Sequence, residues 1–181
     1  MGEQLSPEHS ETVFRGRVIE VAMKRFRDPE GAEYERDVVE HPGAVGILAH
    51  DEELVYLVGQ PREAVGRTDS LEIPAGTLDR ERESPLECAK RELAEEVGLA
   101  AEHWRQLRVI DMTPGYSDER LTLFEATGLS PASAEPDEDE EIEIVRLPLA
   151  ELDRALGEIH DAKTLIALLT LQASRAPQTY P

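Results

Sequence analysis

The sequence predicts an α/β fold in which a mixed β-sheet lies between layers of helices, preceded by a small N-terminal antiparallel sheet. Runs of β-type residues stand on both sides of one sharply delimited helix at 84–97, and helical segments close the chain at 149–159 and 161–175. A further extended stretch at 12–40 precedes the central strands. Strands that surround a central helix and are followed by helices are typical of layered α/β domains.

The N-terminal part is expected to begin with a flexible tail at 1–11, because these residues are polar and acidic. Two β-type runs follow, TVFRGRVIEVAMKRF at 12–26 and AEYERDVVEH at 32–41, joined across a turn that contains Pro29 and Gly31. We expect residues 12–41 to form a separate set of strands, residues 42–175 to form the main domain, and the Pro-rich end at 176–181 to be frayed.

The strands of the main domain are predicted from short apolar runs bounded by turn residues. They are GAVGILAH (43–50), ELVYLVGQ (53–60), the extended piece DSLEIPAGTL (69–78), WRQLRVIDM (104–112), RLTLFEATGL (120–129) and IEIVRLPL (142–149). Pro74 and Gly76 interrupt the third of these runs, and the sequence TPGYSDE (113–119) forms a turn between the fourth and the fifth.

The helix at 84–97 has clear signals at both ends. Ser84, Pro85 and Glu87 provide an N-cap, a proline at the first helical position and an acid at the third, which together predict a capping box. Gly98 is placed to end the helix in a left-handed conformation. The apolar positions that predict its buried stripe are Leu86, Ala89, Leu93 and Val97.

The charge of the chain excludes several classes of partner. The sequence has 39 acidic and 19 basic side chains and a net charge of −20, which repels nucleic-acid backbones and anionic membranes. No apolar run is as long as a membrane span, and the first residues lack a signal-peptide pattern. Cys88 is the single cysteine and cannot form an internal disulfide. From the charge, the lack of long apolar runs and the single cysteine together, we expect a cytoplasmic protein that binds neither nucleic acid nor a membrane.

Three glutamates crowd one face of the predicted helix. Glu92, Glu95 and Glu96 stand at positions i, i+3 and i+4, where like charges destabilise a helix. They are either a solvated acidic face, helped by pairs of Arg91 with Glu87 and Glu95, or ligands for a divalent cation. Glu92 and Glu96 have no oppositely charged residue four positions away. Mg²⁺ or Mn²⁺ would convert their repulsion into binding, since these ions prefer oxygen ligands.

The sequence around these glutamates resembles the signature of the Nudix hydrolase family, G-x5-E-x7-R-E-U-x-E-E-x-G-U, in which U is aliphatic. From Gly76 the chain reads GTLDRERESPLECAKRELAEEVGL. The fixed positions of the second half are all matched, by Arg91, Glu92, Leu93, Glu95, Glu96, Gly98 and Leu99. Glu83 has the required spacing from Arg91, but six residues rather than five separate it from Gly76. A loop absorbs one extra residue easily.

The resemblance implies a Nudix-type α/β/α sandwich and a set of roles. Glu92, Glu95 and Glu96, with the carbonyl oxygen of Ala75, would hold Mg²⁺, or alternatively Mn²⁺. Glu83 and Arg91 would form a salt bridge, while Gly76 would let the backbone turn beside the metal and Gly98 would end the helix. The implied reaction is attack of a metal-activated water on a diphosphate linked to another group, with release of two phosphorylated halves.

Further landmarks resemble the ADP-ribose pyrophosphatase branch of this family. They are EHPGAVGIL, GQPRE, LEIPAG and PGYSDE, the last beginning at Pro114, fifteen residues after Leu99. The resemblance implies hydrolysis of ADP-ribose to AMP and ribose 5-phosphate. The alternatives are a Nudix hydrolase for another nucleotide sugar or a nucleoside triphosphate, and a non-catalytic sensor that binds ADP-ribose. Pro114 and Gly115 are otherwise a plain turn.

The same branch implies a homodimer whose N-terminal strands at 12–41 are exchanged with the partner, next to the Nudix catalytic domain at 42–175. The candidate substrate contacts are Arg36, Arg62, Glu72, Gly115 and Tyr116. The two arginines would supply the cations that an anionic nucleotide needs in an acidic protein. Each of these residues has an ordinary alternative: a surface arginine, a carboxylate that caps a strand, a turn glycine or a loop aromatic.

The general base is expected in the acidic loop PDEDEEIEI at 136–144. A base separate from the metal ligands is expected, because a carboxylate that holds a metal is a weaker base. The resemblance places this base at Glu138 or Glu140. The alternatives are that this loop is only a solvated acidic segment and that Glu95 takes the proton.

Overall fold

The computed structural model describes residues 5–133 and 142–175, and the chain divides into two compact units. The first, called the N-terminal unit, contains the chain up to Ala44 together with Val109–Leu121. The second, called the sheet unit, contains Val45–Arg108 and the chain from Thr122 onward. Each unit has its own backbone framework and is described separately.

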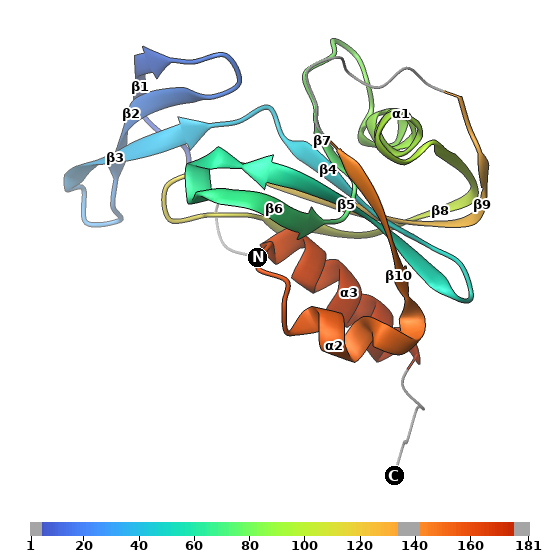
Figure 1. Ribbon diagram of the computed structural model, residues 1–181. Coiled ribbons are helices and arrows are strands. Elements are labelled where there is room, and N and C mark those ends of the chain that lie inside the picture. The colour runs from blue at the N-terminus through green and yellow to red at the C-terminus, as the bar shows by residue number, and fades with distance from the viewer. Residues whose placement is uncertain (1–4, 134–141, 176–181) are drawn as a thin grey trace. The chain divides into compact units, whose positions relative to one another are not determined.

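The N-terminal unit contains an antiparallel sheet with the strand order β1-β2-β3 (Figure 1). Its strands are β1 (His9–Arg15), β2 (Glu20–Arg27) and β3 (Glu33–Glu40). The run predicted at 12–26 is therefore two strands, because the Gly16 N–H donates to the Ile19 carbonyl at 2.9 Å and closes a hairpin turn. β1 also begins inside the stretch expected as a tail: His9 is paired with Arg25 of β2, and backbone pairing does not require apolar side chains.

The turn at 113–119 is fastened to β3 within the same unit. The Val39 N–H donates to the Tyr116 carbonyl at 2.7 Å, and the Asp118 N–H donates to the Val39 carbonyl at 3.1 Å. The Asp118 carboxylate accepts from the backbone N–H of His41 at 2.9 Å. These bonds tie the seven-residue turn to β3.

The sheet unit is built on a sheet in which seven strands pair within the described residues. The order is β10-β5-β4-β9-β8, with β6 beside β5 and β7 beside β4. The strands are β4 (Ala44–His50), β5 (Leu54–Arg62), β6 (Arg67–Glu72), β7 (Ala75–Thr77), β8 (Leu99–Asp111), β9 (Arg120–Pro131) and β10 (Glu143–Pro148). The last residues of β8, from Val109, and the first residues of β9, to Leu121, belong to the N-terminal unit.

Helices cover both faces of this sheet. α1 (Pro85–Val97) lies over one face, and α2 (Leu152–Leu156) and α3 (Ala162–Arg175) lie over the other (Figure 1). Two short 3-10 turns, η1 (Glu63–Val65) and η2 (Leu149–Glu151), complete the secondary structure. The predicted sandwich of a mixed sheet between helices is confirmed. Within residues 5–133 and 142–175, no helix is both long enough and apolar enough to span a bilayer.

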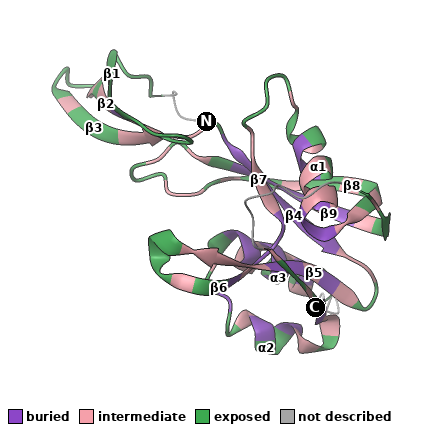
Figure 2. Cartoon of the chain, turned by 45° about the horizontal axis from the view of Figure 1, so that its top comes forward, coloured by how far each residue is buried: buried purple, intermediate pink, exposed green. Residues whose placement is uncertain are grey.

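The core between α1 and the sheet consists mainly of aliphatic side chains, and Figure 2 shows β4 as largely buried. Leu93 of α1 is fully buried, as are Ile47 of β4 and Val58 of β5, and each such side chain stabilises the fold by about 1.5–3 kcal/mol. The other members of this cluster are Val45, Ala49, Cys88, Ala89, Val97, Phe124 and Ala126. Residues of β4 are buried along almost the whole strand, which is why this run has no polar alternation.

The capping signals of α1 operate as predicted. Ser84 is the N-cap, its side chain accepts from the Glu87 N–H, and the Glu87 carboxylate accepts from the Ser84 N–H at 2.9 Å. Gly98 adopts a φ of 69°, a left-handed conformation, and its N–H donates to Ala94 and Leu93 carbonyls. Both helix ends are thus fixed by residues within the motif.

Two elements differ from the sequence prediction. β8 starts at Leu99 rather than at Trp104, because the chain leaves Gly98 directly into a strand with no intervening turn. The helix predicted at 149–159 is reduced to η2 and a five-residue α2, since Pro148 stands before it and Gly157 ends it.

Candidate active site

The acidic face of α1 meets β7 so closely that a side chain at position 76 would displace Glu92. A β-carbon added to Gly76 would lie 2.0 Å from Oε1 of Glu92 and 2.4 Å from its γ-carbon. The Glu92 side chain therefore occupies the space that any other residue at position 76 would need. The sequence reason given for Gly76, a sharp turn, is replaced here by a close approach of a side chain to the backbone.

Glu83 and Arg91 join the loop before α1 to the helix. Arg91 Nε donates to Glu83 Oε1 at 2.9 Å and Nη2 donates to Oε2 at 3.0 Å. This forked geometry is the strong form of an arginine–carboxylate pair, and the hydrogen bond from Arg91 lowers the pKa of Glu83. In this loop, which is one residue longer than the signature, Arg82 adopts a φ of 66°.

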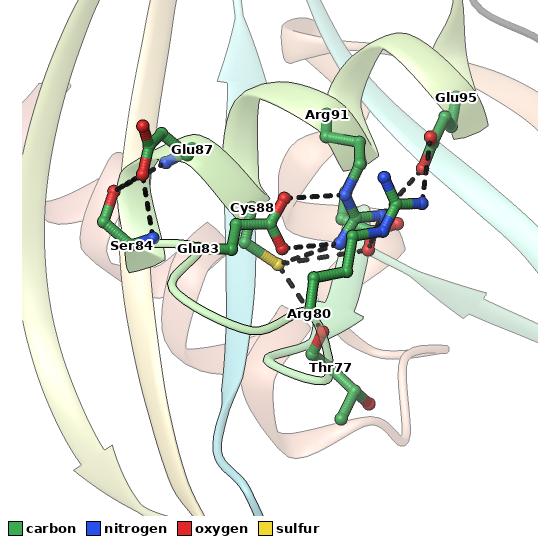
Figure 3. A network of polar contacts seen from close by, with 9 residues as sticks. Thr77, Arg80, Glu83, Ser84, Glu87, Cys88, Arg91 and Glu95 are labelled. Carbon is green, nitrogen blue, oxygen red and sulfur yellow. Dashed lines mark hydrogen bonds and ion pairs between the residues drawn. The ribbon is translucent and has the colours of Figure 1, made fainter.

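Arg91 also joins two of the crowded glutamates. Its Nη1 donates to Glu92 Oε1 at 2.6 Å and to Glu95 Oε2 at 2.8 Å (Figure 3). Arg80, from the same loop, lies with its Nη2 3.5 Å from Glu95 Oε1. The sequence search for partners four positions away missed the contact with Glu92, because adjacent residues on a helix do not normally face each other.

Glu96 points to the backbone of β7. It is 8% exposed, and its Oε2 accepts the Ala75 N–H at 3.1 Å. The resemblance implies that the carbonyl oxygen of Ala75 is a metal ligand. In the structure, it is the N–H group of Ala75 that contacts a helix glutamate. The carboxylate of Glu96 thereby fixes β7 against α1.

The chemistry of these donors fits a hard divalent cation. Glu92, Glu95 and Glu96 supply carboxylate oxygens from one helix, and two of them already share a single cationic nitrogen of Arg91. In the arrangement seen here, Arg91 takes that shared position, and no group of three or more His, Cys, Asp or Glu side chains in the described ranges is disposed around one metal position. Oxygen donors alone favour Mg²⁺ or Mn²⁺ over softer metals.

Cys88 lies next to this network but has no catalytic character. Its side chain is buried, and burial raises the pKa of the thiol to about 12. Its Sγ lies 3.6 Å from the Thr77 carbonyl oxygen (Figure 3). A thiol that stays protonated at neutral pH is a poor nucleophile, so Cys88 is a core residue.

A second charged group lies elsewhere in the sheet unit and includes the last residue of β5, Arg62, and the last residue of β6, Glu72. Arg62 Nε and Nη2 donate to the two oxygens of Glu72 at 2.8 and 2.7 Å. Burial alone would raise the pKa of Glu72, but the hydrogen bonds and charges of Arg62 and Lys163 outweigh it and hold the pKa at about 2. Arg62 and Glu72 line a cavity of about 520 Å³, which is in the size range of small-ligand sites.

Lys163 and Asp161 complete this second group, and the sequence interpretation did not include them. They belong to the stretch DAK at the start of the last predicted helix. A charged residue followed by a lysine in an otherwise apolar helix was the signal available. Its significance depends on Glu72, 91 residues away in the sequence, and local patterns contain no information on that contact.

The remaining predicted site residues are not all in the sheet unit. Arg36, Gly115 and Tyr116 belong to the N-terminal unit, where the Arg36 guanidinium lies 4.7 Å from the centre of the Tyr34 ring. Tyr116 is 59% exposed, and a β-carbon at Gly115 would contact nothing within 4 Å. Glu138 and Glu140 lie outside the described residues.

Comparisons with known proteins match the same part of the chain. The NUDIX domain profile covers residues 40–168. The chain is 37% identical over 173 residues to an ADP-ribose pyrophosphatase of Bacillus subtilis (strain 168), covering 93% of this chain and 92% of that protein. It is also 37% identical over 172 residues to a methanol dehydrogenase activator of Bacillus methanolicus, covering 92% of each.

A solved structure shows the same fold. The crystal structure of an ADP compounds hydrolase superimposes with a TM-score of 0.80 and 27% sequence identity, over 95% of this chain and 94% of that one. The likeness extends over nearly the whole length of both chains, and the family profile spans the glutamates of α1, Gly76 and the Arg62 cavity. The resemblance noted from the sequence is thus confirmed, and the chain belongs to the Nudix family.

Proposed function

We propose that this chain, a Nudix diphosphate hydrolase, cleaves ADP-ribose to AMP and ribose 5-phosphate with Mg²⁺, for which Mn²⁺ can substitute. The observation that carries the proposal is that one nitrogen of Arg91 holds Glu92 and Glu95, while Glu96 on the same helix accepts from the Ala75 N–H next to Gly76. The forked Glu83–Arg91 pair joins the preceding loop to this helix. The name of the B. subtilis relative and the landmarks around Pro114 support ADP-ribose as the substrate.

The metal would be held by Glu92, Glu95 and Glu96, with the carbonyl oxygen of Ala75. When bound, such an ion supplies charge neutralisation for the diphosphate and a more acidic water molecule. Arg91 has the complementary task in the protein: it holds Glu92 and Glu95 together while its other nitrogens fasten the Glu83 loop to the helix. The carboxylates are thereby prevented from separating under their mutual repulsion.

Arg62 is the proposed cationic contact for the diphosphate. Its side chain is 43% exposed although it is tied to the buried Glu72, so part of the guanidinium faces the cavity. A protein with a net charge of −20 repels an anionic substrate at long range, and a fixed arginine at the site offsets this locally. Glu72, Arg36, Gly115 and Tyr116 remain the other proposed contacts.

The general base is proposed to be Glu138 or Glu140, with Glu95 as the next candidate. Glu95 is less suitable in the arrangement seen here, because Arg91 and Arg80 both lie against its oxygens. A base must accept a proton from water, and one oxygen of Glu95 already accepts a hydrogen bond from the Arg91 guanidinium.

The proposed assembly is a homodimer formed through the N-terminal strands, located in the cytoplasm. All residues of β1 are exposed, including Val13 at 53% and Phe14 at 57%. Exposed apolar residues on an edge strand favour pairing with another chain. The cytoplasmic location is consistent with the buried free thiol of Cys88.

A substrate panel with product identification by mass spectrometry tests the proposed function. With Mg²⁺, ADP-ribose should yield AMP and ribose 5-phosphate without free pyrophosphate. Faster turnover of another nucleotide sugar, or release of pyrophosphate from a nucleoside triphosphate, would identify a different Nudix hydrolase. Tight binding of ADP-ribose without turnover in Mg²⁺ would identify the non-catalytic sensor.

A further inference from the structure

Lys163 is a buried lysine in the first turn of α3, on the opposite side of the sheet from α1. It is 8% exposed, and its Nζ contacts a Glu72 oxygen and lies 3.0 Å from Asp161 Oδ1. Burial of a lysine is costly unless carboxylates pair with it. Lys163 is buried despite this cost in free energy, and it lines the cavity. Packing alone does not explain a lysine at this position.

The four charges of this cluster alternate in sign along a line of contacts. Arg62 is bound to Glu72, Glu72 to Lys163, and Lys163 to Asp161. Only Arg62 is substantially exposed, at 43% of its side chain, whereas Glu72 and Lys163 are exposed by 3% and 11%. Nε and Nη2 of Arg62 both donate to Glu72. Nη1 of Arg62 has no hydrogen-bond partner in the described part of the chain.

The contacts of Glu72 show what the lysine contributes. Oε2 of Glu72 is approached by both Arg62 Nη2 and Lys163 Nζ, and Oε1 accepts only from Arg62 Nε. An arginine fork needs its carboxylate in the plane of the guanidinium. A second cation on one oxygen, supplied by a rigid helix, opposes rotation of the carboxylate out of that plane.

The backbone around Lys163 is fixed in turn to the strand that leads to the active site. Asp161 Oδ2 accepts from the Thr164 N–H at 2.9 Å, and the Thr164 hydroxyl accepts from the Ile73 N–H at 2.8 Å. Ile73 follows Glu72 directly and precedes Ala75 by two residues. The start of α3, the carboxylate of Glu72 and the approach to β7 therefore form one connected structure.

We propose that Lys163 is a positioning residue, which through Glu72 holds the Arg62 guanidinium so that its unpaired edge meets the diphosphate of the substrate. The inference rests on the proposed function in one respect only, namely that Arg62 contacts the substrate. Lys163 itself touches neither the substrate nor the reacting atoms.

The kinetic test compares Lys163→Met with the wild type and with Arg105→Met. Arg105 is the control, because it also forms an ion pair in the sheet unit, with its Nη2 2.9 Å from Glu125 Oε2, but it contacts neither Arg62 nor Glu72. Lys163→Met should raise the KM for ADP-ribose about tenfold, the effect of losing roughly 1.4 kcal/mol of binding, and leave kcat nearly unchanged. Arg105→Met should leave the KM unchanged even if it lowers the melting temperature.

A double-variant cycle separates positioning from general stability. In an Arg62→Ala background, Lys163→Met should cause no further rise in KM, because the residue through which it acts is gone. Equal effects of Lys163→Met in both backgrounds would overturn the inference. If Lys163→Met does not fold, Lys163→Gln, which keeps a donor but no charge, replaces it throughout the cycle.

A spectroscopic readout makes the inference independent of the substrate. The ¹⁵N-detected Nε–Hε signal of Arg62, assigned by its loss in Arg62→Ala, should shift and exchange faster with solvent in Lys163→Met but not in Arg105→Met. An unchanged signal would overturn the inference. If the wild type does not hydrolyse ADP-ribose, the proposed function fails, and the positioning of Arg62 by Lys163 is then decided by this signal alone.

Discussion

The Glu92 side chain fills the place where any residue other than Gly76 would have its β-carbon. A β-carbon built on Gly76 would lie 2.0 Å from Glu92 Oε1. The contact joins β7 to α1 at the point where the acidic side chains gather. The orientation of Glu92, a proposed metal ligand, therefore depends on the absence of a side chain at Gly76 of β7.

Gly76→Ala should displace Glu92 without unfolding the protein, because the clash is with the movable end of a flexible side chain. We expect the affinity for Mn²⁺, measured by electron paramagnetic resonance, to fall by about tenfold or more. Gly59→Ala is the control, since a β-carbon there meets its nearest neighbours at an ordinary 3.8 Å. Unchanged Mn²⁺ affinity in Gly76→Ala would show that Glu92 is not a ligand.

Removal of the helix carboxylates should abolish catalysis rather than folding. Glu92→Gln and Glu96→Gln should each lower kcat by orders of magnitude, because each loses a charge proposed to hold the metal. Chelation of the wild type with EDTA should have the same effect, and Mg²⁺ should reverse it. Glu87→Gln is the matched control on the same helix: it weakens the capping box and should leave kcat unchanged. Full activity in EDTA would contradict the metal site.

The pair formed by Arg62 and Glu72 predicts acid sensitivity. The pKa of Glu72 is about 2 in the folded protein and 4.5 ordinarily, so its contribution to stability is complete above pH 4.5 and is lost as the pH falls toward 2. The contribution is on the order of a few kcal/mol, at about 1.4 kcal/mol per pKa unit. Urea unfolding between pH 6 and pH 2.5 should show a steeper loss in the wild type than in Glu72→Gln. Parallel curves would mean that Glu72 has an ordinary pKa.

The extra residue in the loop before α1 predicts a stabilising substitution. Arg82 has a φ of 66° and is the one residue other than glycine, in the described part of the chain, with a positive φ. Arg82→Gly should raise the free energy of unfolding by about 0.5–1 kcal/mol, measured from the denaturant midpoint. Arg82→Ala removes the same charge but keeps the unfavourable conformation, so it should give no gain. Equal gains from both variants would assign the effect to charge.

The N-terminal strands predict a dimer in solution. Light scattering should give about twice the chain mass of 20.2 kDa. Phe14→Asp places a charge in the exposed strand β1 and should shift the equilibrium toward monomer, whereas Glu11→Asp, on the same strand, should not. A monodisperse and fully active wild-type monomer would refute the assembly proposed here.

The parts of the structure that local sequence determines could be predicted. The ends of α1 follow from Ser84, Pro85 and Gly98, whose effects act within one turn of the helix. The contact of Arg91 with Glu92 could not be predicted, because it depends on the rotamer that Glu83 imposes on the arginine from outside the helix.

The ion cluster at the cavity lay beyond any local pattern. Glu72 and Lys163 are far apart in sequence and meet only because α3 packs on the sheet beside β6. The split of 12–26 into two strands was missed for a different reason. The turn at Gly16 is made by one backbone bond, whereas β-branched and aromatic residues continue on both sides of it and predict an unbroken strand.

The two charged groups also differ in how much of the chain must exist before they can form. Glu83 and Arg91 are separated by eight positions, whereas Glu72 and Lys163 are separated by 91. Because the entropy of loop closure grows with the length of the loop, the glutamate-bearing motif can order itself from neighbouring residues. During synthesis on the ribosome, the cavity acquires its complete set of charges only after α3 has emerged, so a chain interrupted before Lys163 would carry the acidic motif without the lysine that secures Glu72.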